Sequence, residues 1–292
     1  MVVSAGNTII GFIGLGVMGK SMVSHLLKGG YRAYVYNRTK SKAEDVLKLG
    51  AEWKDTPAEV AGAADVIITI VGYPADVEEV YLGDSGILGS AKKGSVVIDM
   101  TTSSPELATR IYIEADRKNI RALDAPVSGG DIGAREGKLS IMVGGDRQTY
   151  EEVKPLFELM GENIVFQGKA GSGQHCKMAN QIAIASNIIG VCESVRYAEK
   201  AGLDPAAVLQ SISSGAAASW SLSNLAPRML KGDFEPGFYI KHFIKDLGIA
   251  LQSAGDIGLE ASGLELAKSL YDKLAAEGKE DLGTQALYTY YK

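Results

Sequence analysis

The sequence has little of what metal centres and disulfide frameworks require. Among its 292 residues are three histidines, and their positions in the chain form no metal-binding motif. Its two cysteines, Cys176 and Cys192, are sixteen residues apart on one expected helix, too far along the axis to form a disulfide with each other. We therefore expect no bound metal and a reducing, cytoplasmic setting.

The charge balance and the hydropathy exclude two further classes of protein. The formal net charge is −5 at pH 7, so the chain lacks the basic surface that nucleic-acid binding needs. Its apolar runs are shorter than a membrane-spanning helix. The uncharged residues 1–7 do not resemble a signal peptide. We expect no nucleic-acid partner and no membrane partner.

The chain is long enough for two domains. Up to residue 168, β-branched and apolar runs alternate with helical patterns, and beyond it the strand signals disappear. Alternating strands and helices predict a doubly wound parallel sheet. The expected strands are residues 8–13, 32–36, 65–71, 95–100, 121–125, 138–143 and 163–167. We predict an α/β domain over residues 1–168 and an all-α domain over residues 169–292.

The second domain begins with an unusually long helical pattern. Residues 174–201 contain no proline, which corresponds to about 40 Å of continuous helix joining the two domains. Further helices are expected over residues 205–214, 219–230, 242–254, 261–276 and 283–290. The helices expected in the first domain are residues 20–27, 41–49, 56–63, 75–81, 105–118 and 149–160.

A glycine-rich turn lies between the first expected strand and the first expected helix. In this context, G-x-G-x-x-G is typical of dinucleotide binding. The first glycine permits the turn, the second lets the backbone approach a pyrophosphate, and the third lets helix and strand pack closely. The pyrophosphate would lie at the helix N-terminus, where unpaired N–H groups favour an anion. The predicted cofactor-binding residues are Gly14, Leu15, Gly16, Val17, Met18 and Gly19.

The end of the second expected strand indicates which dinucleotide is bound. An NAD site usually has an acidic residue here, bonded to the ribose 2′-hydroxyl. This chain has Asn37, Arg38 and Thr39 instead, and an arginine can bind a 2′-phosphate through two hydrogen bonds. We predict NADP as the cofactor, with NAD possible. The alternative is that Arg38 is a solvated loop residue.

Hydroxyl-bearing and glycine-rich segments follow two later strands. Thr101 and Thr102 precede an expected helix, so they can cap that helix or contact the cofactor. Ser128, Gly129 and Gly130 offer a hydroxyl and exposed N–H groups that suit a carboxylate. The alternative for these three residues is a plain glycine turn.

Two lysines in the second half are candidates for the chemistry. Lys177 and Asn180 are three residues apart, so they share one face of the long helix. Lys245 is followed by Asp246, which could orient it or cap the helix. For both lysines the alternative is an exposed side chain, the common fate of lysine on a helix surface.

Four stretches of the chain together resemble the β-hydroxyacid dehydrogenase family, which includes 3-hydroxyisobutyrate dehydrogenase and tartronate semialdehyde reductase. They are residues 11–19, 124–130, 171–180 and 245–246. The resemblance implies a Rossmann domain, a helical domain and a homodimer or homotetramer. It also implies that Lys177 is catalytic, with Asn180 beside it. By the same resemblance, Ser128, Gly129 and Gly130 would hold the substrate carboxylate, and Thr101, Thr102 and Lys245 would contact cofactor or substrate.

One departure from the family pattern narrows the substrate. Members that act on succinic semialdehyde carry Ser-Lys-Lys after the serine, where this chain has Gly129, Gly130 and Asp131. We therefore expect a compact hydroxy acid or semialdehyde, such as 3-hydroxyisobutyrate or tartronate semialdehyde, and an enzyme that transfers a hydride to or from NADP(H). The alternatives are an imine reductase-like enzyme and a non-catalytic NADP-binding scaffold. Relatives of both kinds usually lack the lysine that this chain keeps at Lys177.

Overall fold

The computed structural model describes residues 3–292. The chain divides into two compact units, of which the first ends at Lys177 and the second runs from Met178 to Lys292. The division falls inside the long helix α9 (Ser172–Lys200), so the first residues of this helix belong to the first unit. The domain boundary after Gly168 stays a prediction.

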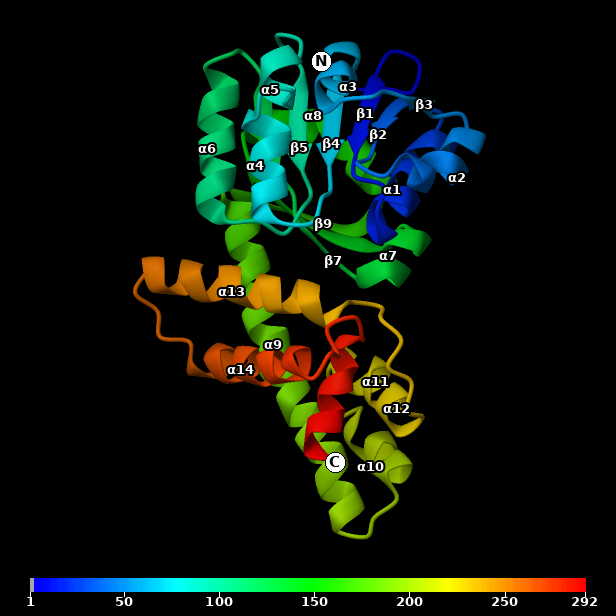
Figure 1. Ribbon diagram of the computed structural model, residues 1–292, viewed down its shortest axis with the longest axis vertical. Helices are drawn as coiled ribbons and strands as arrows, with labels where there is room; N and C mark the ends of the chain where they lie inside the picture. Colours follow the sequence, from blue (N-terminus) through cyan, green and yellow to red (C-terminus); the bar gives the residue numbers. More distant parts are fainter. Residues whose placement is uncertain (1–2) are drawn as a thin grey trace. The chain divides into compact units, whose positions relative to one another are not determined.

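The first unit is built around one mixed but mostly parallel sheet (Figure 1). Its strand order is β3-β2-β1-β4-β5-β6-β8-β7, and β9 pairs with β8. All neighbours from β3 to β6 are parallel, as predicted, whereas β8 runs antiparallel to β6 and β7. The strands are β1 (Ile9–Ile13), β2 (Arg32–Tyr36), β3 (Glu52–Trp53), β4 (Val66–Thr69), β5 (Val96–Asp99), β6 (Arg121–Asp124), β7 (Val127–Ser128), β8 (Leu139–Gly145) and β9 (Gly161–Gly168).

Helices cover both faces of this sheet. They are α1 (Val17–Lys28), α2 (Glu44–Lys48), α3 (Pro57–Ala63), α4 (Pro74–Leu82), α5 (Ile87–Ser90), α6 (Pro105–Asp116), α7 (Gly130–Glu136) and α8 (Arg147–Glu158), with a 3₁₀ turn at Lys40–Ala43. The expected helix over residues 41–49 is therefore split into a 3₁₀ turn and α2. Side chains of Thr56, Ser104 and Asp146 accept N–H bonds from the first turns of α3, α6 and α8, which explains where these helices begin.

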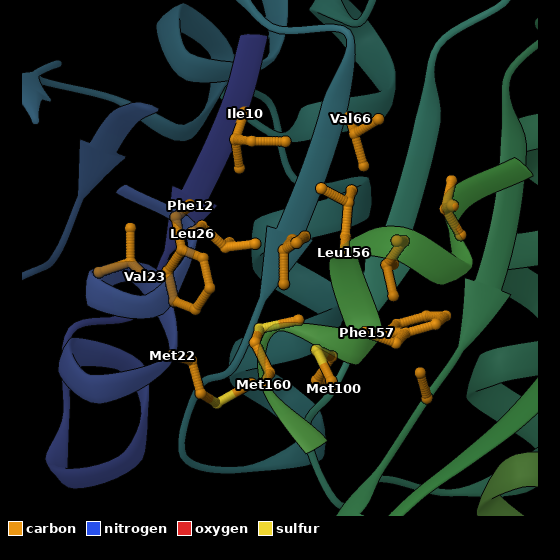
Figure 2. Packing of buried hydrophobic residues seen from close by; sticks show 14 of the residues in the cluster. Ile10, Phe12, Met22, Val23, Leu26, Val66, Met100, Leu156, Phe157 and Met160 are labelled. Carbon is orange, nitrogen blue, oxygen red and sulfur yellow. The ribbon is translucent and has the colours of Figure 1, made fainter. Parts of the chain in front are cut away.

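The sheet separates two apolar layers, because successive strand residues point to opposite faces. In β5, Val96 and Ile98 belong to the layer under α1 and α8, and Val97 belongs to the layer under α3, α4 and α6. Figure 2 shows the first layer, where α1 contributes Met22, Val23 and Leu26 and α8 contributes Leu156 and Phe157.

The second unit is all-helical, as predicted (Figure 1). Its core includes Phe243 and Tyr271, whose rings are 5.0 Å apart in an edge contact. The expected helix over residues 219–230 is two short helices, because Pro227 lies in the first turn of the second one. Besides the rest of α9, the helices are α10 (Pro205–Ile212), α11 (Trp220–Asn224), α12 (Ala226–Leu230), α13 (Ile240–Asp256), α14 (Ser262–Ala276) and a 3₁₀ helix (Thr284–Tyr291). Among residues 3–292, no helix is both long and apolar enough to cross a membrane.

Candidate active site

The first and third glycines of the turn after β1 are required by packing. Gly14 has a φ of 102°, and a Cβ there would lie 2.0 Å from the carbonyl oxygen of Ile70. A Cβ on Gly19 would lie 1.9 Å from the oxygen of Gly14. The N–H of Gly14 donates to the oxygen of Tyr36 at 3.0 Å. The chain can therefore turn from β1 into α1 only with glycine at both positions.

Gly16 is different, because the space beside it is open. No described atom lies within 4 Å of a Cβ built at this position. Gly16 is the N-cap of α1, no side chain caps this helix, and its first turn contains no acidic residue. The N–H groups of that turn are thus accessible to an anion from outside. The residues present fit the pyrophosphate of a dinucleotide.

The segment after β2 both supports this turn and presents an arginine. Asn37 Oδ1 accepts the N–H of Leu15 at 2.9 Å, and Asn37 Nδ2 donates to the oxygen of Thr39 at 2.9 Å. Asn37 therefore fastens the glycine turn, a supporting role that the sequence alone did not reveal. The side chain of Arg38 is 86% exposed, and its Nη1 lies 3.5 Å from Asp76 Oδ1. An exposed pair of this length is weak, so Arg38 can exchange it for a phosphate.

A buried carboxyl group organises the loop that follows β5. Asp99 Oδ1 accepts from Thr69 Oγ1 at 2.9 Å and from the N–H of Thr101 at 3.1 Å. Burial raises the pKa of Asp99 to about 6, although these hydrogen bonds oppose the rise. Thr101 Oγ1 accepts the N–H of Val71 at 2.9 Å, so this buried threonine links the loop after β5 to the loop after β4. Thr102, next to it, is half-buried.

The start of α9 is bound to the ends of two strands. Asp124, the last residue of β6, accepts the N–H of Gly171 at 2.8 Å with Oδ1 and the N–H of Gln174 at 2.9 Å with Oδ2. Gln174 Nε2 donates to the oxygen of Thr101 at 2.7 Å, and its Oε1 accepts the N–H of Ser103 at 2.9 Å. The first turn of α9 is therefore held against the loop after β5 and the end of β6.

This close contact depends on a glycine of α9. A Cβ on Gly173 would lie 2.3 Å from the oxygen of Met142 and 2.7 Å from the oxygen of Asp124. Burial raises the pKa of Asp124, while its backbone hydrogen bonds oppose that rise. The sequence marked residues 171–180 as important but did not reveal that Asp124 and Gln174 hold them.

Lys177 is buried in the second turn of α9. Only 6% of the surface of Lys177 is exposed, and its Nζ donates to the oxygen of Val127 at 2.9 Å. The alternative of an exposed surface lysine is therefore excluded. Val127 directly precedes Ser128, so the ammonium group lies beside the segment predicted to bind the carboxylate.

The Ser-Gly-Gly segment joins a short strand to a helix, and its binding of a carboxylate stays a prediction. Ser128 ends the short strand β7, and α7 begins two residues later. Gly129 and Gly130 have φ values of 128° and 63°, a backbone conformation that other residues rarely adopt. Ser128 is half-buried and Gly129 is exposed. The strand and the helix meet at these glycines, which allow the abrupt change of direction between them.

In the second unit, Asn180 and Lys245 belong to one polar row, whose members Gln181 and Asp246 are buried. Asn180 Nδ2 donates to Gln181 Oε1 at 2.7 Å, and Gln181 Nε2 donates to Asp246 Oδ2 at 2.6 Å. Lys245 Nζ lies 2.9 Å from Asp246 Oδ1, and the Lys245 side chain is only 12% exposed. The alternative of an exposed Lys-Asp pair is therefore excluded. Gln181 and Asp246 are polar partners that spacing alone did not identify as a set.

Two family models together match nearly the whole chain. Residues 9–168 match the family model described as the NAD-binding domain of 6-phosphogluconate dehydrogenase. Residues 171–291 match the model described as the NAD-binding domain of NADP-dependent 3-hydroxyisobutyrate dehydrogenase.

Individual relatives match at similar coverage. An uncharacterised oxidoreductase of Bacillus subtilis is 64% identical, over 96% of this chain and 97% of its own. The 2-hydroxy-3-oxopropionate reductase of Escherichia coli is 43% identical, over 95% of each chain. The structure of Mycobacterium tuberculosis 3-hydroxyisobutyrate dehydrogenase with L-serine superposes with a TM-score of 0.90 at 30% identity, covering 98% of this chain and 99% of the other.

The chain thus belongs to the β-hydroxyacid dehydrogenase family, the group that includes 3-hydroxyisobutyrate dehydrogenase and tartronate semialdehyde reductase. It is an NAD(P)-dependent oxidoreductase with an N-terminal Rossmann-like domain and a helical C-terminal domain. The family and fold expected from the sequence are confirmed.

Proposed function

We propose that this protein is an NADP(H)-dependent dehydrogenase acting on a small 3-hydroxy acid, or on the corresponding semialdehyde in the reverse direction. The observation that supports this most directly is the buried Lys177, whose Nζ is bound to the oxygen of the residue before Ser128. Such a lysine can donate to a substrate oxygen while Ser128 and the next N–H groups bind the carboxylate. The nicotinamide cofactor supplies or accepts the hydride.

The proposed roles divide between proton handling and substrate binding. Lys177 stabilises the negative charge that develops on the substrate oxygen and delivers or accepts the proton. Asn180, three residues later on α9, assists at the same helix face. Ser128, Gly129 and Gly130 anchor the carboxylate, which fixes the carbon that reacts. Thr101, Thr102 and Lys245 are proposed to contact cofactor or substrate.

The preference for NADP over NAD rests on Arg38. The end of β2 lacks an acidic residue, and Arg38 is exposed and only weakly paired. A charge-assisted bond to the 2′-phosphate contributes about 1.5–3 kcal/mol, so kcat/KM should favour NADP by roughly tenfold to a hundredfold. We expect Arg38→Asp to reverse this preference. Arg32→Asp, which changes an exposed arginine at the other end of β2, is the matched control and should not. Equal kcat/KM for both cofactors in the unmodified protein would contradict the proposal.

The substrate is proposed to be compact and to carry a carboxylate. Relatives of this chain are named for 3-hydroxyisobutyrate and for 2-hydroxy-3-oxopropionate, and L-serine, also a 3-hydroxy acid, is present in the mycobacterial structure. Gly129 and Gly130 follow Ser128, so these two positions have no side chain that could bind the far end of a longer substrate. A homodimer or homotetramer and a cytoplasmic location stay predictions.

A panel of substrates tests this function. Reduced nicotinamide absorbance is followed with 3-hydroxyisobutyrate, L-serine, tartronate semialdehyde, succinic semialdehyde and a cyclic imine, each with NADP(H) and NAD(H). We expect turnover of a small 3-hydroxy acid or its semialdehyde and none of its amide or methyl ester. Turnover of the imine alone would identify an imine reductase, and cofactor binding without turnover would indicate a scaffold. Either result would overturn the proposal.

A further inference from the structure

The hydrogen bonds of the polar row Asn180–Gln181–Asp246 all run the same way, from donor to acceptor toward Asp246. Asn180 donates to Gln181, and Gln181 donates to Asp246, at 2.7 and 2.6 Å. Gln181 is 0% exposed and Asp246 is 2% exposed, so water does not compete for the second bond. In a buried row of this kind, each group must meet its partner with the correct atom.

Asp246 determines that direction. An ionised carboxylate only accepts hydrogen bonds, and the Lys245 ammonium 2.9 Å from Oδ1 is the opposite charge that a buried carboxylate requires. Gln181 must therefore turn its NH₂ group toward Asp246 and its oxygen toward Asn180. Asn180 must in turn direct its own NH₂ group to Gln181. Turning either amide over would place like atoms against each other.

We propose that Gln181 and Asp246 are positioning residues that hold the Asn180 amide with its oxygen facing away from the row, so that Asn180 acts as an acceptor in the active site. The inference rests on the proposed function, in which Asn180 assists Lys177. An acceptor can bind an amine N–H or a hydroxyl O–H, but it cannot stabilise an alkoxide. With its oxygen on the free side, Asn180 is placed to orient a hydrogen-bond donor, while Lys177 supplies the positive charge that stabilises an alkoxide.

Thermal unfolding tests the direction of the row without any turnover. Asn180→Asp places an oxygen where Gln181 already presents one, so we expect the unfolding temperature to fall by about 2–4 °C. Asp246→Asn supplies an NH₂ group at the end of the row, and the amide of Gln181 can then turn over. In the Asp246→Asn background, Asn180→Asp should therefore lower the unfolding temperature much less. An equal fall in both backgrounds would overturn the inference.

Exchanging the amide of Gln181 and the carboxylate of Asp246 tests the consequence for catalysis. Gln181→Glu places two carboxylates side by side, and Asp246→Asn removes the group that sets the direction. We expect each to lower kcat by about tenfold, with little change in the KM for the cofactor. The double variant Gln181→Glu/Asp246→Asn again offers Asn180 an acceptor and keeps one negative charge near Lys245. It should recover kcat to within about threefold of the unmodified protein.

The pH dependence separates positioning from general loss of structure. In Gln181→Glu the two neighbouring carboxyl groups share a proton at low pH, which restores the bond between them. Its kcat should therefore fall as pH rises, whereas the double variant should follow the unmodified protein. The matched control is Gln252→Glu, because Gln252 Nε2 donates to Asp256 Oδ1 at 2.8 Å on the surface of the same unit. This control should leave kcat unchanged.

The outcomes distinguish the inference from the proposed function. If the unmodified protein turns over no hydroxy acid, the proposed function fails, and the unfolding comparison alone decides the direction of the row. If the protein is active but the double variant is as impaired as the single variants, the inference is overturned and the proposed function stands.

Discussion

Asp124 in the first unit and Asp246 in the second are both buried carboxyl groups, yet they have different kinds of partner. Asp124 accepts two backbone N–H groups, from Gly171 and Gln174. Asp246 accepts a side-chain amide and lies beside the ammonium of Lys245. The first arrangement fixes main chain and so determines where α9 begins. The second fixes side chains and so determines which atom of a neighbouring amide is presented.

This difference leads us to expect different sensitivities to mutation. Backbone atoms are in close contact around Asp124, so we expect any larger side chain there to lower the stability of the protein. A side-chain row can be rebuilt with other polar groups, so the neighbourhood of Asp246 should tolerate paired exchanges. The following variants test the first half of this contrast, and the exchanges at Gln181 and Asp246 test the second.

The largest effect is expected at Gly173. Gly173→Ala would place a Cβ 2.3 Å from the oxygen of Met142, and neither backbone can move without breaking the bonds to Asp124. We expect a loss of stability of more than about 3 kcal/mol, or no folded protein at all. The control is Gly190→Ala on the same helix, where no described atom lies within 4 Å of the new Cβ. It should be neutral or about 0.5–1 kcal/mol more stable, because alanine favours helix. Similar thermal melting of the two variants would contradict the contrast.

A smaller effect is expected from Asp124→Asn. An asparagine has one acceptor oxygen, so one buried N–H of α9 would lose its partner, at a cost of about 1–3 kcal/mol. Because the start of α9 would shift, kcat should also fall. Asp146→Asn is the matched control, since Asp146 accepts the N–H of Thr149 at 2.8 Å but is exposed, so water can replace the bond. Melting temperature and kcat should be nearly unchanged in the control, and equal losses in both variants would argue against a role for Asp124 in placing Lys177.

The smallest effect is expected from Asp99→Asn, and it depends on pH. Burial raises the pKa of Asp99 from 3.8 to about 6, so the folded state binds its proton more tightly than the unfolded state. This carboxyl therefore destabilises the fold progressively as pH rises from about 4 to about 6, and the penalty stays constant above that range. An asparagine can still accept from Thr69 and Thr101 but carries no charge. Relative to the unmodified protein, the variant should gain stability between pH 4 and pH 6; a pH-independent difference in melting temperature would refute this.

The features that the sequence predicted well are those whose constraints are local. Gly14, Gly16 and Gly19 lie within six residues of one another, and their spacing after a strand was enough to predict a dinucleotide-binding turn. The doubly wound sheet followed from alternating strand and helix patterns, whereas the burial of Lys177 is known from the structure alone. The antiparallel β8 and the short β7 were not predicted, because strand direction at an edge depends on partners that a local pattern does not record.

The supporting residues were missed for a related reason. Asp124 binds residues 47 and 50 positions further along, and Gln181 binds a partner 65 positions away. No spacing rule connects such distant residues. The expected contact of Asn37 with the cofactor stays a prediction, and the structure adds that its side chain supports the glycine turn through Leu15. A polar residue at a strand end is the only signal that the sequence offered for either role.

The kinetics of Lys177→Ala test the central claim most directly. The variant removes the proposed donor to the substrate oxygen while leaving the glycine turn and Arg38 untouched, so kcat should fall by at least roughly a hundredfold. The dissociation constant for NADPH, measured by fluorescence titration, should hardly change. Lys177→Arg keeps the charge but transfers a proton poorly at neutral pH, so it should restore little activity. Near-normal turnover by the alanine variant would contradict the account, and so would a variant that no longer folds, because Lys177 would then be a structural residue.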